Sequence, residues 1–258
     1  MDEQLIAFAC RLADAARAET LTRSRTAGAS ANKAADGYDP VTEADVAAEA
    51  AMRALIRAAY PDHGIAGEEM PDHPAAGPFT WSLDPIDGTR SFVCGLPTWT
   101  TLIALLRDGA PVLGVIDAPR LGERYVGTRD GARLIDAGGE ATLSTSGCAT
   151  LAEARLSTTD PALFAGAEAD AFARVLRRTR IVRYGHDAYA YARLAAGTVD
   201  LVVESGLKPY DLNALIPVVR GAGGAVGDWR GGEDWLGGRL VAAATPELFA
   251  EALAALAA

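Results

Sequence analysis

The spacing of apolar residues predicts two amphipathic helices in the first part of the chain. In residues 3–21 and 41–60, apolar side chains recur every three or four positions, which is the period of one helix face. The expected buried positions are Leu5, Phe8, Ala9, Leu12 and Ala16 in the first segment, and Val46, Ala50, Leu55, Ile56 and Ala59 in the second. Residues 22–40 are small and polar with Gly and Pro, which predicts a loop.

Short apolar runs separated by Asp-Gly pairs predict β-hairpins in the middle of the chain. Residues 101–117 and 124–135 each read as two strands joined at Asp-Gly, a favoured two-residue turn. After residue 137, helical and strand periodicities alternate, which is typical of helices covering a sheet. The expected helices there are 167–179, 187–197, 211–224 and 246–258, and the expected strands are 180–184, 198–204 and 239–245. The sequence therefore predicts an α/β protein with an α+β half (1–137) and an α/β half (138–258).

Composition narrows the possible classes of protein. The 258 residues are 50% hydrophobic and 22% charged, as in an ordinary globular protein, and the formal net charge is −10 without a Lys/Arg cluster. Nucleic acid and anionic membrane surfaces are therefore not expected as partners. The three cysteines are far apart without a C-x-x-C pair, the start lacks a signal-peptide pattern, and no run approaches ~18 apolar residues. We expect a soluble, cytoplasmic protein.

The stretch WSLDPIDGTRSF is the most informative motif. Asp84 and Asp87 flank Pro85 where a strand-like segment runs into Gly88. Pro85 favours an extended Asp84, and Gly88 allows a tight turn before a short helix. Such a turn can bring both carboxylates and the Ile86 carbonyl to one point, where Mg²⁺ would relieve their repulsion. A bare D-x-x-D is better explained by capping or solvent exposure, but the whole D-P-I-D-G-T favours a metal.

Further acidic residues lie at expected element ends. Glu68 and Glu69 follow an apolar run, and Asp211 begins an apolar helix. Thr42 and Asp45 have capping-box spacing. For Asp211, local sequence alone favours a helix N-cap over a site. For Asp45, local sequence leaves the cap and the site both open.

Taken together and in this order, GEE, DPIDGT, and KPYD followed by an apolar helix and GAGG resemble the inositol monophosphatase superfamily of Mg²⁺-dependent phosphomonoesterases. The resemblance covers nearly the whole chain. It implies the layered α/β/α/β/α sandwich of the inositol monophosphatase and fructose-1,6-bisphosphatase type, with the site between a metal-binding first half and a substrate-specificity second half. It also implies two or three Mg²⁺ ions per site and a homodimer.

The resemblance assigns roles to residues of this chain. The implied ligands of one metal are Glu68, Asp84 and the Ile86 carbonyl, and those of a second are Asp84, Asp87 and Asp211. Thr89, paired with Asp45, would orient and deprotonate the attacking water. The Gly88 and Thr89 amides would receive the phosphate at a helix N-terminus. Lys33 is a candidate for a closing contact, and Arg90 for pairing with phosphate or with a substrate-site carboxylate.

The stretch YGHDAYAYARLAAGTVDLVVESGLKPYD resembles the histidinol-phosphatase branch of the superfamily more than the inositol branch. Where that branch usually reads Gly-Asp-Cys-Tyr, Asp187 matches and Ala188 departs. Glu204 stands seven residues before Asp211, at the position of a substrate-contacting glutamate. Carboxylates at Asp187 and Glu204 would pair with the ammonium and imidazole of histidinol phosphate more naturally than with a neutral polyol, and Tyr210 could stack on the imidazole. For Asp187, a helix N-cap is the simpler alternative.

The expected activity is hydrolysis of L-histidinol phosphate to L-histidinol and phosphate, a step of histidine biosynthesis. One alternative is a phosphatase for inositol monophosphate or another small sugar phosphate. A second is a non-catalytic binding protein that kept the fold, which would be expected to have lost at least one of the six central side chains. All six are present: Asp45, Glu68, Asp84, Asp87, Thr89 and Asp211.

Overall fold

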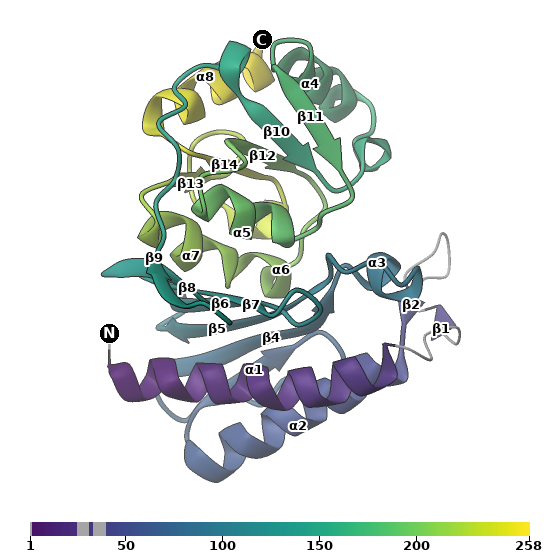
Figure 1. Ribbon diagram of the computed structural model, residues 1–258, viewed down its shortest axis with the longest axis vertical. Helices are drawn as coiled ribbons and strands as arrows, with labels where there is room; N and C mark the ends of the chain where they lie inside the picture. The colour runs from purple at the N-terminus through teal and green to yellow at the C-terminus, as the bar shows by residue number, and fades with distance from the viewer. Residues whose placement is uncertain (1, 25–30, 33–39) are drawn as a thin grey trace.

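A seven-stranded sheet and a five-stranded sheet stack with helices in five layers (Figure 1). The computed structural model describes residues 2–24, 31–32 and 40–258. Lys33 and most of the expected loop 22–40 lie outside the described residues. The helices are α1 (Glu3–Arg23), α2 (Glu43–Ala59), α3 (Thr89–Val93), α4 (Ala167–Leu176), α5 (Tyr189–Ala195), α6 (Pro209–Leu212), α7 (Leu215–Gly221) and α8 (Pro246–Ala257), with short 3₁₀ turns η1 (Leu151–Glu153), η2 (Pro161–Leu163) and η3 (Trp235–Gly237).

The first sheet follows the order of the chain. Its strands are β3 (Gly64–Gly67), β4 (Phe79–Asp87), β5 (Thr100–Arg107), β6 (Ala110–Ala118), β7 (Glu123–Thr128), β8 (Gly131–Asp136) and β9 (Gly139–Thr142). β3 is parallel to β4, and every later neighbour is antiparallel. Both expected hairpins are present. β5 and β6 turn at Asp108-Gly109 as expected, whereas β7 and β8 turn at Arg129-Asp130, one residue before the expected Asp130-Gly131, because Gly131 already pairs with Thr128 as the first residue of β8. A separate antiparallel pair joins β1 (Ala31–Asn32) and β2 (Pro40–Val41).

The second sheet is mixed, in the order β11-β10-β12-β14-β13. Its strands are β10 (Arg155–Thr158), β11 (Ile181–Tyr184), β12 (Leu201–Glu204), β13 (Ala225–Gly227) and β14 (Leu240–Ala243). β10 is parallel to β11 and β12, and β14 is antiparallel to β12 and β13. The short strands β10 and β13 were not expected from the apolar pattern. The expected helix 211–224 is broken into α6 and α7.

Three clusters of buried apolar side chains pack the five layers together. The first joins α1 and α2 to the seven-stranded sheet, and the second joins the other face of that sheet to α5, α7 and the second sheet. The third packs α4 and α8 on the outer face of the second sheet. The described elements therefore form the expected α/β/α/β/α sandwich, and α5, α6 and α7 lie between the sheets (Figure 1). The division of the chain at residue 137 stays a prediction.

Helix α2 corrects one sequence expectation. Val46 is 44% exposed, and Ala50 and Ala59 are also exposed, so the expectation was wrong at these three positions, whereas Ile56 is buried and Leu55 partly buried. The buried residues are Ala44, Asp45, Ala48, Glu49, Met52, Arg53 and Ile56. Three of these seven are charged, and apolar spacing alone therefore does not identify the whole buried side. By contrast, Phe8, Ala9, Leu12 and Ala16 of α1 are buried as expected.

None of the helices in the described ranges is both long and apolar enough to cross a membrane.

Candidate functional site

A β-bulge brings the two aspartates of DPIDGT to the same side of β4. Asp84 pairs with Leu102 of β5 and Asp87 with Thr100, so three steps on β4 oppose two steps on β5. In a regular strand, residues three apart point to opposite faces, and one extra residue in a bulge reverses that. Thr101 fixes the bulge, because its Oγ1 donates a hydrogen bond of 2.7 Å to the Pro85 carbonyl.

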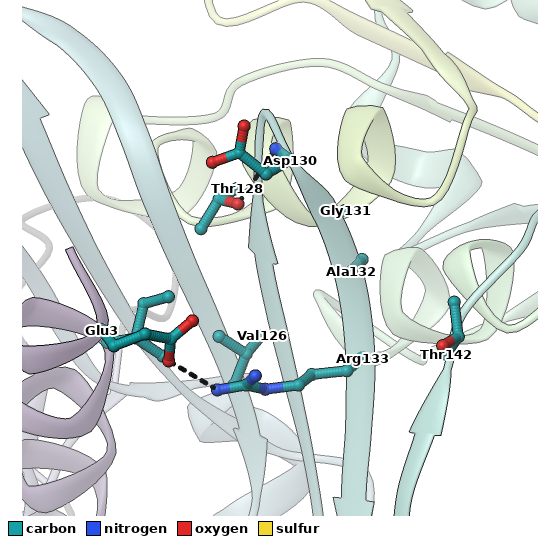
Figure 2. A pocket seen from close by; sticks show the side chains of 9 residues that line it. Glu3, Val126, Thr128, Asp130, Gly131, Ala132, Arg133 and Thr142 are labelled. Atoms are coloured by element: carbon teal, nitrogen blue, oxygen red, sulfur yellow. Dashed lines mark hydrogen bonds and ion pairs between the residues drawn. The ribbon is translucent and has the colours of Figure 1, made fainter. Parts of the chain in front are cut away.

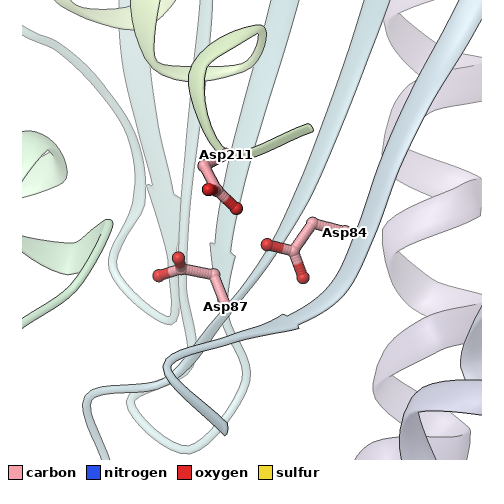
Figure 3. A group of neighbouring side chains, drawn as sticks. All are labelled: Asp84, Asp87 and Asp211. Atoms are coloured by element: carbon pink, nitrogen blue, oxygen red, sulfur yellow. The ribbon is translucent and has the colours of Figure 1, made fainter. Parts of the chain in front are cut away.

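Helix α6 supplies a third carboxylate from the second half of the chain. Asp211 and the two aspartates of β4 each offer an oxygen within 4.8 Å of the others (Figure 3). The Asn213 amide donates to Ser82 of β4 across 3.1 Å, which ties the end of α6 to the strand. The Asp211 carboxylate also accepts from the Lys208 amide at 2.6 Å, so it caps α6 as well as facing the cluster.

These carboxylates destabilise one another's charged form. Burial is the largest cause of an Asp84 pKa well above its usual range, and the charges of Glu68 and Asp87 raise it further. For Asp87, burial again comes first and the charge of Asp187 second. Burial raises the pKa of Asp211 to about 7 against the opposing hydrogen bond from Lys208. The cluster therefore concentrates negative charge that a cation would stabilise.

The donor set fits a hard divalent cation. Asp84 is 1% exposed, and its Oδ1 atom has no hydrogen-bond partner among the described residues. A buried oxygen of that kind is costly unless something binds it. Glu68 follows the end of β3, and its charge acts on both Asp84 and Asp211. All these groups offer carboxylate oxygens, the ligands that Mg²⁺ prefers.

Asp45 and Thr89 lie beside this cluster. Asp45 is fully buried at the start of α2, where its Oδ2 accepts from the Thr42 amide at 2.8 Å and the Thr42 hydroxyl at 2.6 Å. The capping box is therefore confirmed, and the charge of Asp45 also raises the pKa of Asp84. Thr89 Oγ1 donates to the Ile86 carbonyl at 3.0 Å. The pairing of Thr89 with Asp45 stays a prediction.

Asp187 reaches the cluster from the segment before α5. It has a φ of 47°, in the left-handed region, and its Oδ2 accepts from Ser91 of α3 at 3.3 Å. A Cβ on Gly88, whose φ is 81°, would lie 2.8 Å from that same oxygen, so glycine is required both by the turn and by the contact. The next amide, that of Ala188, donates to Asp87 at 2.6 Å. This segment of the second half is therefore docked on DPIDGT.

Glu204 ends β12 and is 2% exposed. Its carboxylate accepts from the Thr159 amide at 2.7 Å, the Thr159 hydroxyl at 3.0 Å and the Thr158 hydroxyl at 3.2 Å. Burial raises its pKa to about 8 against these hydrogen bonds, and the charge of Asp187 adds to the rise. Glu204 and Asp187 therefore lie within electrostatic reach of each other.

The remaining candidates lie at the rim. Arg90 is exposed on α3, with Nη1 3.9 Å from a carboxylate oxygen of Asp160. Tyr210 is partly buried on α6, next to Asp211.

Several contacts that organise the site were missed from sequence. Thr158, the last residue of β10, and Thr159, which follows it, hold Glu204, and β10 is too short for its periodicity to be read. The Ser91 and Ala188 contacts join residues about a hundred positions apart, for which no local signal exists. In α2, the i,i+4 spacing of Glu49 and Arg53 was a readable signal for an ion pair.

A separate hollow of about 270 Å³ lies against the first sheet, between α1 and β7–β8. In Figure 2, Glu3 of α1 and Arg133 of β8 face each other across it, with an ion-pair distance of 3.8 Å. Asp130 lies at its edge. Its lining residues do not include the acidic cluster, so we place the functional site at the cluster.

Comparison with known proteins assigns the family. A model described as the inositol monophosphatase family matches residues 1–258. The chain belongs to the inositol monophosphatase family. A solved inositol monophosphatase from Zymomonas mobilis superimposes with a TM-score of 0.85 at 38% identity, covering 99% of this chain and 98% of that one. The fold and the acidic cluster are therefore those of a family of phosphomonoesterases that use divalent metal ions.

Two relatives are similar to most of this chain. The chain is 48% identical over 198 residues to the bifunctional phosphatase IMPL2, chloroplastic, of Arabidopsis thaliana. That match covers 76% of this chain but 56% of IMPL2, so the chain spans little more than half of that relative's length. It is 36% identical over 248 residues to the histidinol-phosphatase of Mycobacterium tuberculosis, covering 93% of both chains.

The raised carboxyl pKa values predict how stability changes with pH. The folded pKa values of Asp211 (about 7) and Glu204 (about 8) exceed their unfolded values near 4, so between these limits the folded state binds more protons. Stability therefore falls as pH rises through this window. We expect metal-free protein in EDTA to melt at a lower temperature at pH 8 than at pH 6.5, and Mg²⁺ to raise the melting temperature more at pH 8.

His63 and His186 have lowered pKa values and act in the opposite sense, but mainly below pH 6.5. Thermal melts followed by circular dichroism at the two pH values test the prediction. A higher melting temperature of the metal-free protein at pH 8 than at pH 6.5 would contradict it.

Proposed function

We propose that this protein is a Mg²⁺-dependent phosphomonoesterase whose substrate is L-histidinol phosphate, giving L-histidinol and phosphate in histidine biosynthesis. The observation that supports this substrate is a second pair of carboxylates, Asp187 and Glu204. Asp187 and Glu204 add negative charge next to a cluster that already holds Asp84, Asp87 and Asp211, and a neutral polyol would leave that charge unpaired.

The proposed metal ligands are Glu68, Asp84 and the Ile86 carbonyl for one ion, and Asp84, Asp87 and Asp211 for a second. When bound, Mg²⁺ neutralises these carboxylates, makes the site attractive to a phosphate, activates water and stabilises the leaving oxygen. The Ile86 carbonyl accepts from Thr89 Oγ1 but has a second lone pair available.

The chain's own groups carry out the remaining steps. In the proposed mechanism, Thr89 and Asp45 orient the attacking water and receive its proton. Asp45 suits this role because two hydrogen bonds from Thr42 fix its carboxylate at the start of α2. The amides of Gly88 and Thr89 would bind the phosphate oxygens, and Arg90 stands at the same turn for the phosphate or a substrate-site carboxylate.

Recognition of the alcohol part would fall to the second half of the chain. Glu204 is fixed by three donors, so it would meet the substrate ammonium with a preset geometry. Pairing with an ammonium also favours the ionised carboxylate, and would lower a pKa that burial has raised. Asp187 would serve as the second acidic contact. The name of the Mycobacterium tuberculosis relative, a histidinol-phosphatase, supports this choice.

Phosphate release from histidinol phosphate and inositol 1-phosphate, at matched concentrations with Mg²⁺, tests the proposal. We expect a kcat/KM preference of ~100-fold or more for histidinol phosphate, which corresponds to about 2.7 kcal/mol in the transition state. Equal kcat/KM values for the two substrates would be compatible with a phosphomonoesterase but would contradict the assignment of histidinol phosphate as its substrate. The opposite preference would favour the inositol or sugar-phosphate alternative, and the similar protein from Zymomonas mobilis is described as an inositol monophosphatase.

The cytoplasmic location, which rests on three scattered cysteines without a C-x-x-C pair, and the homodimer, which rests on the family resemblance, are further proposals. Gel filtration with light scattering checks the homodimer, and a monomer at micromolar concentration would contradict it.

A further inference from the structure

A buried ion pair on α2 holds the segment that carries Glu68. Glu49 is fully buried and Arg53 is 3% exposed, and the Arg53 Nε atom lies 2.7 Å from Glu49 Oε1. Both side chains come from the middle of α2, yet most of their remaining hydrogen bonds leave the helix. Their partners are backbone groups of Glu69, Met70 and Pro71.

Glu49 holds two successive amides. The Glu69 amide donates to Glu49 Oε2 at 2.8 Å, and the Met70 amide donates to Oε1 at 3.1 Å. Arg53 holds the next two carbonyls, with Nη2 donating to the Met70 carbonyl at 3.0 Å and Nη1 to the Pro71 carbonyl at 3.0 Å. The residue directly before this clamped backbone is Glu68, whose own amide donates to the Leu83 carbonyl of β4 at 3.2 Å.

Gly67 shows how closely the clamp fits the chain. A Cβ on Gly67 would lie 2.2 Å from Glu49 Oε1 and 2.8 Å from Arg53 Nη2, closer than such atoms can approach. Only a glycine therefore lets the backbone pass against the ion pair. Glu68 is thus fixed on both sides, by Gly67 in the sheet and by Glu69 on the clamp.

The same row of α2 carries Asp45. Asp45, Glu49 and Arg53 are spaced four residues apart, which places them along one face of the helix, and all three are buried. With a rise of about 1.5 Å per residue, one rigid helix therefore sets the separation between Asp45 and the Glu68 segment.

We infer that Glu49 and Arg53 are positioning residues that fix the Glu68 carboxylate relative to Asp45 and Asp84, and so set the affinity of the site for Mg²⁺. This inference rests on the proposed metal role of Glu68. A pair that served stability alone would be satisfied by any contact within the core. This pair instead directs four hydrogen bonds at the three residues that follow Glu68.

Glu49→Gln tests the inference with the least change in volume. The amide nitrogen of glutamine cannot accept from a backbone amide. If the remaining oxygen takes the place of Oε1, it still serves Arg53 and Met70, and the variant loses the acceptor for the Glu69 amide. We expect the Mg²⁺ dissociation constant of the metal-free protein, measured by titration calorimetry, to rise on the order of 10- to 100-fold. We also expect faster hydrogen exchange at residues 69 and 70, and a kcat at saturating Mg²⁺ close to that of the wild type.

Asp200→Asn is the matched control. Asp200 is a 1% exposed carboxylate that accepts from a backbone amide, Arg155 N at 2.8 Å, and from the Arg155 guanidinium. It therefore resembles Glu49 chemically but lies before β12, away from Glu68. This variant should lose stability without a change in Mg²⁺ affinity. Gly67→Ala, which displaces the clamp from the other side, should weaken Mg²⁺ binding as Glu49→Gln does and supplies the test if Glu49→Gln does not fold.

Glu68→Gln distinguishes failure of the metal role of Glu68 from failure of the positioning role of Glu49 and Arg53. If Glu68→Gln leaves Mg²⁺ affinity unchanged, the metal role of Glu68 in the proposed function is wrong. If Glu68→Gln weakens binding but Glu49→Gln and Gly67→Ala do not, the positioning role is overturned and the metal site stands. In a double-mutant cycle, Glu49→Gln should have little further effect on affinity once Glu68 is already Gln; additive losses would also overturn the positioning role.

Discussion

Asp84→Asn is expected to lower kcat/KM for any phosphate monoester by more than ~10³-fold, or about 4 kcal/mol in the transition state. Asp84 is the one side chain assigned to both proposed metal sites, and its Oδ1 is a buried oxygen without a hydrogen-bond partner among the described residues. Asparagine offers one side-chain oxygen where aspartate offers two. Its other terminal atom is an N–H₂ group, which cannot bind a cation. Phosphate release from a generic ester with Mg²⁺ measures the loss.

The same substitution is expected to stabilise the metal-free protein at pH 8, which distinguishes lost chemistry from misfolding. Repulsion by Glu68, Asp87 and Asp211 raises the pKa of Asp84 on top of burial, and asparagine removes that repulsion. Each kcal/mol gained should raise the melting temperature in EDTA by roughly 2–4 °C. Retained activity would contradict the assignment of Asp84 as a metal ligand. A lower melting temperature would contradict the electrostatic account of the cluster.

Glu204→Gln is expected to reduce the preference for histidinol phosphate over a neutral ester roughly 10- to 100-fold, because a hydrogen bond to a charged group contributes about 1.5–3 kcal/mol. Gln keeps the size of the side chain and one carbonyl acceptor for the Thr159 contacts, and loses the charge. The loss should therefore fall on the cationic substrate. Parallel kcat/KM measurements on the two substrates give the ratio.

Glu168→Gln is the control for a general change of charge. Glu168 accepts from the hydroxyl of Ser205, the residue after Glu204, and pairs with Arg239 toward the surface. It removes a negative charge from the same neighbourhood without touching the buried carboxylate, so the substrate ratio should stay near that of the wild type. Equal losses on both substrates in Glu204→Gln would remove Glu204 from the specificity role.

The sequence by itself determined the elements whose causes are local. Helix α1 buries four of its five expected residues, both hairpins form where expected with the first turning at its Asp-Gly pair, and Thr42 and Asp45 form the capping box of α2. Propensity, turn chemistry and capping act between near neighbours, so they can be read from spacing alone. The acidic residues of the site could be named for a related reason, since DPIDGT combines residue types whose joint occurrence has a mechanical explanation.

Only the tertiary structure decided how those residues meet. The bulge that turns Asp84 and Asp87 to one side exists through pairing with β5, and the Ala188 amide reaches Asp87 across a separation of 101 residues. The face of α2 was misread in part because the stripe it buries carries Glu49 and Arg53, which become favourable in the core only through partners on another segment. A buried charge is stable only when its partners are in place. Those partners are brought together by packing, which local spacing does not encode.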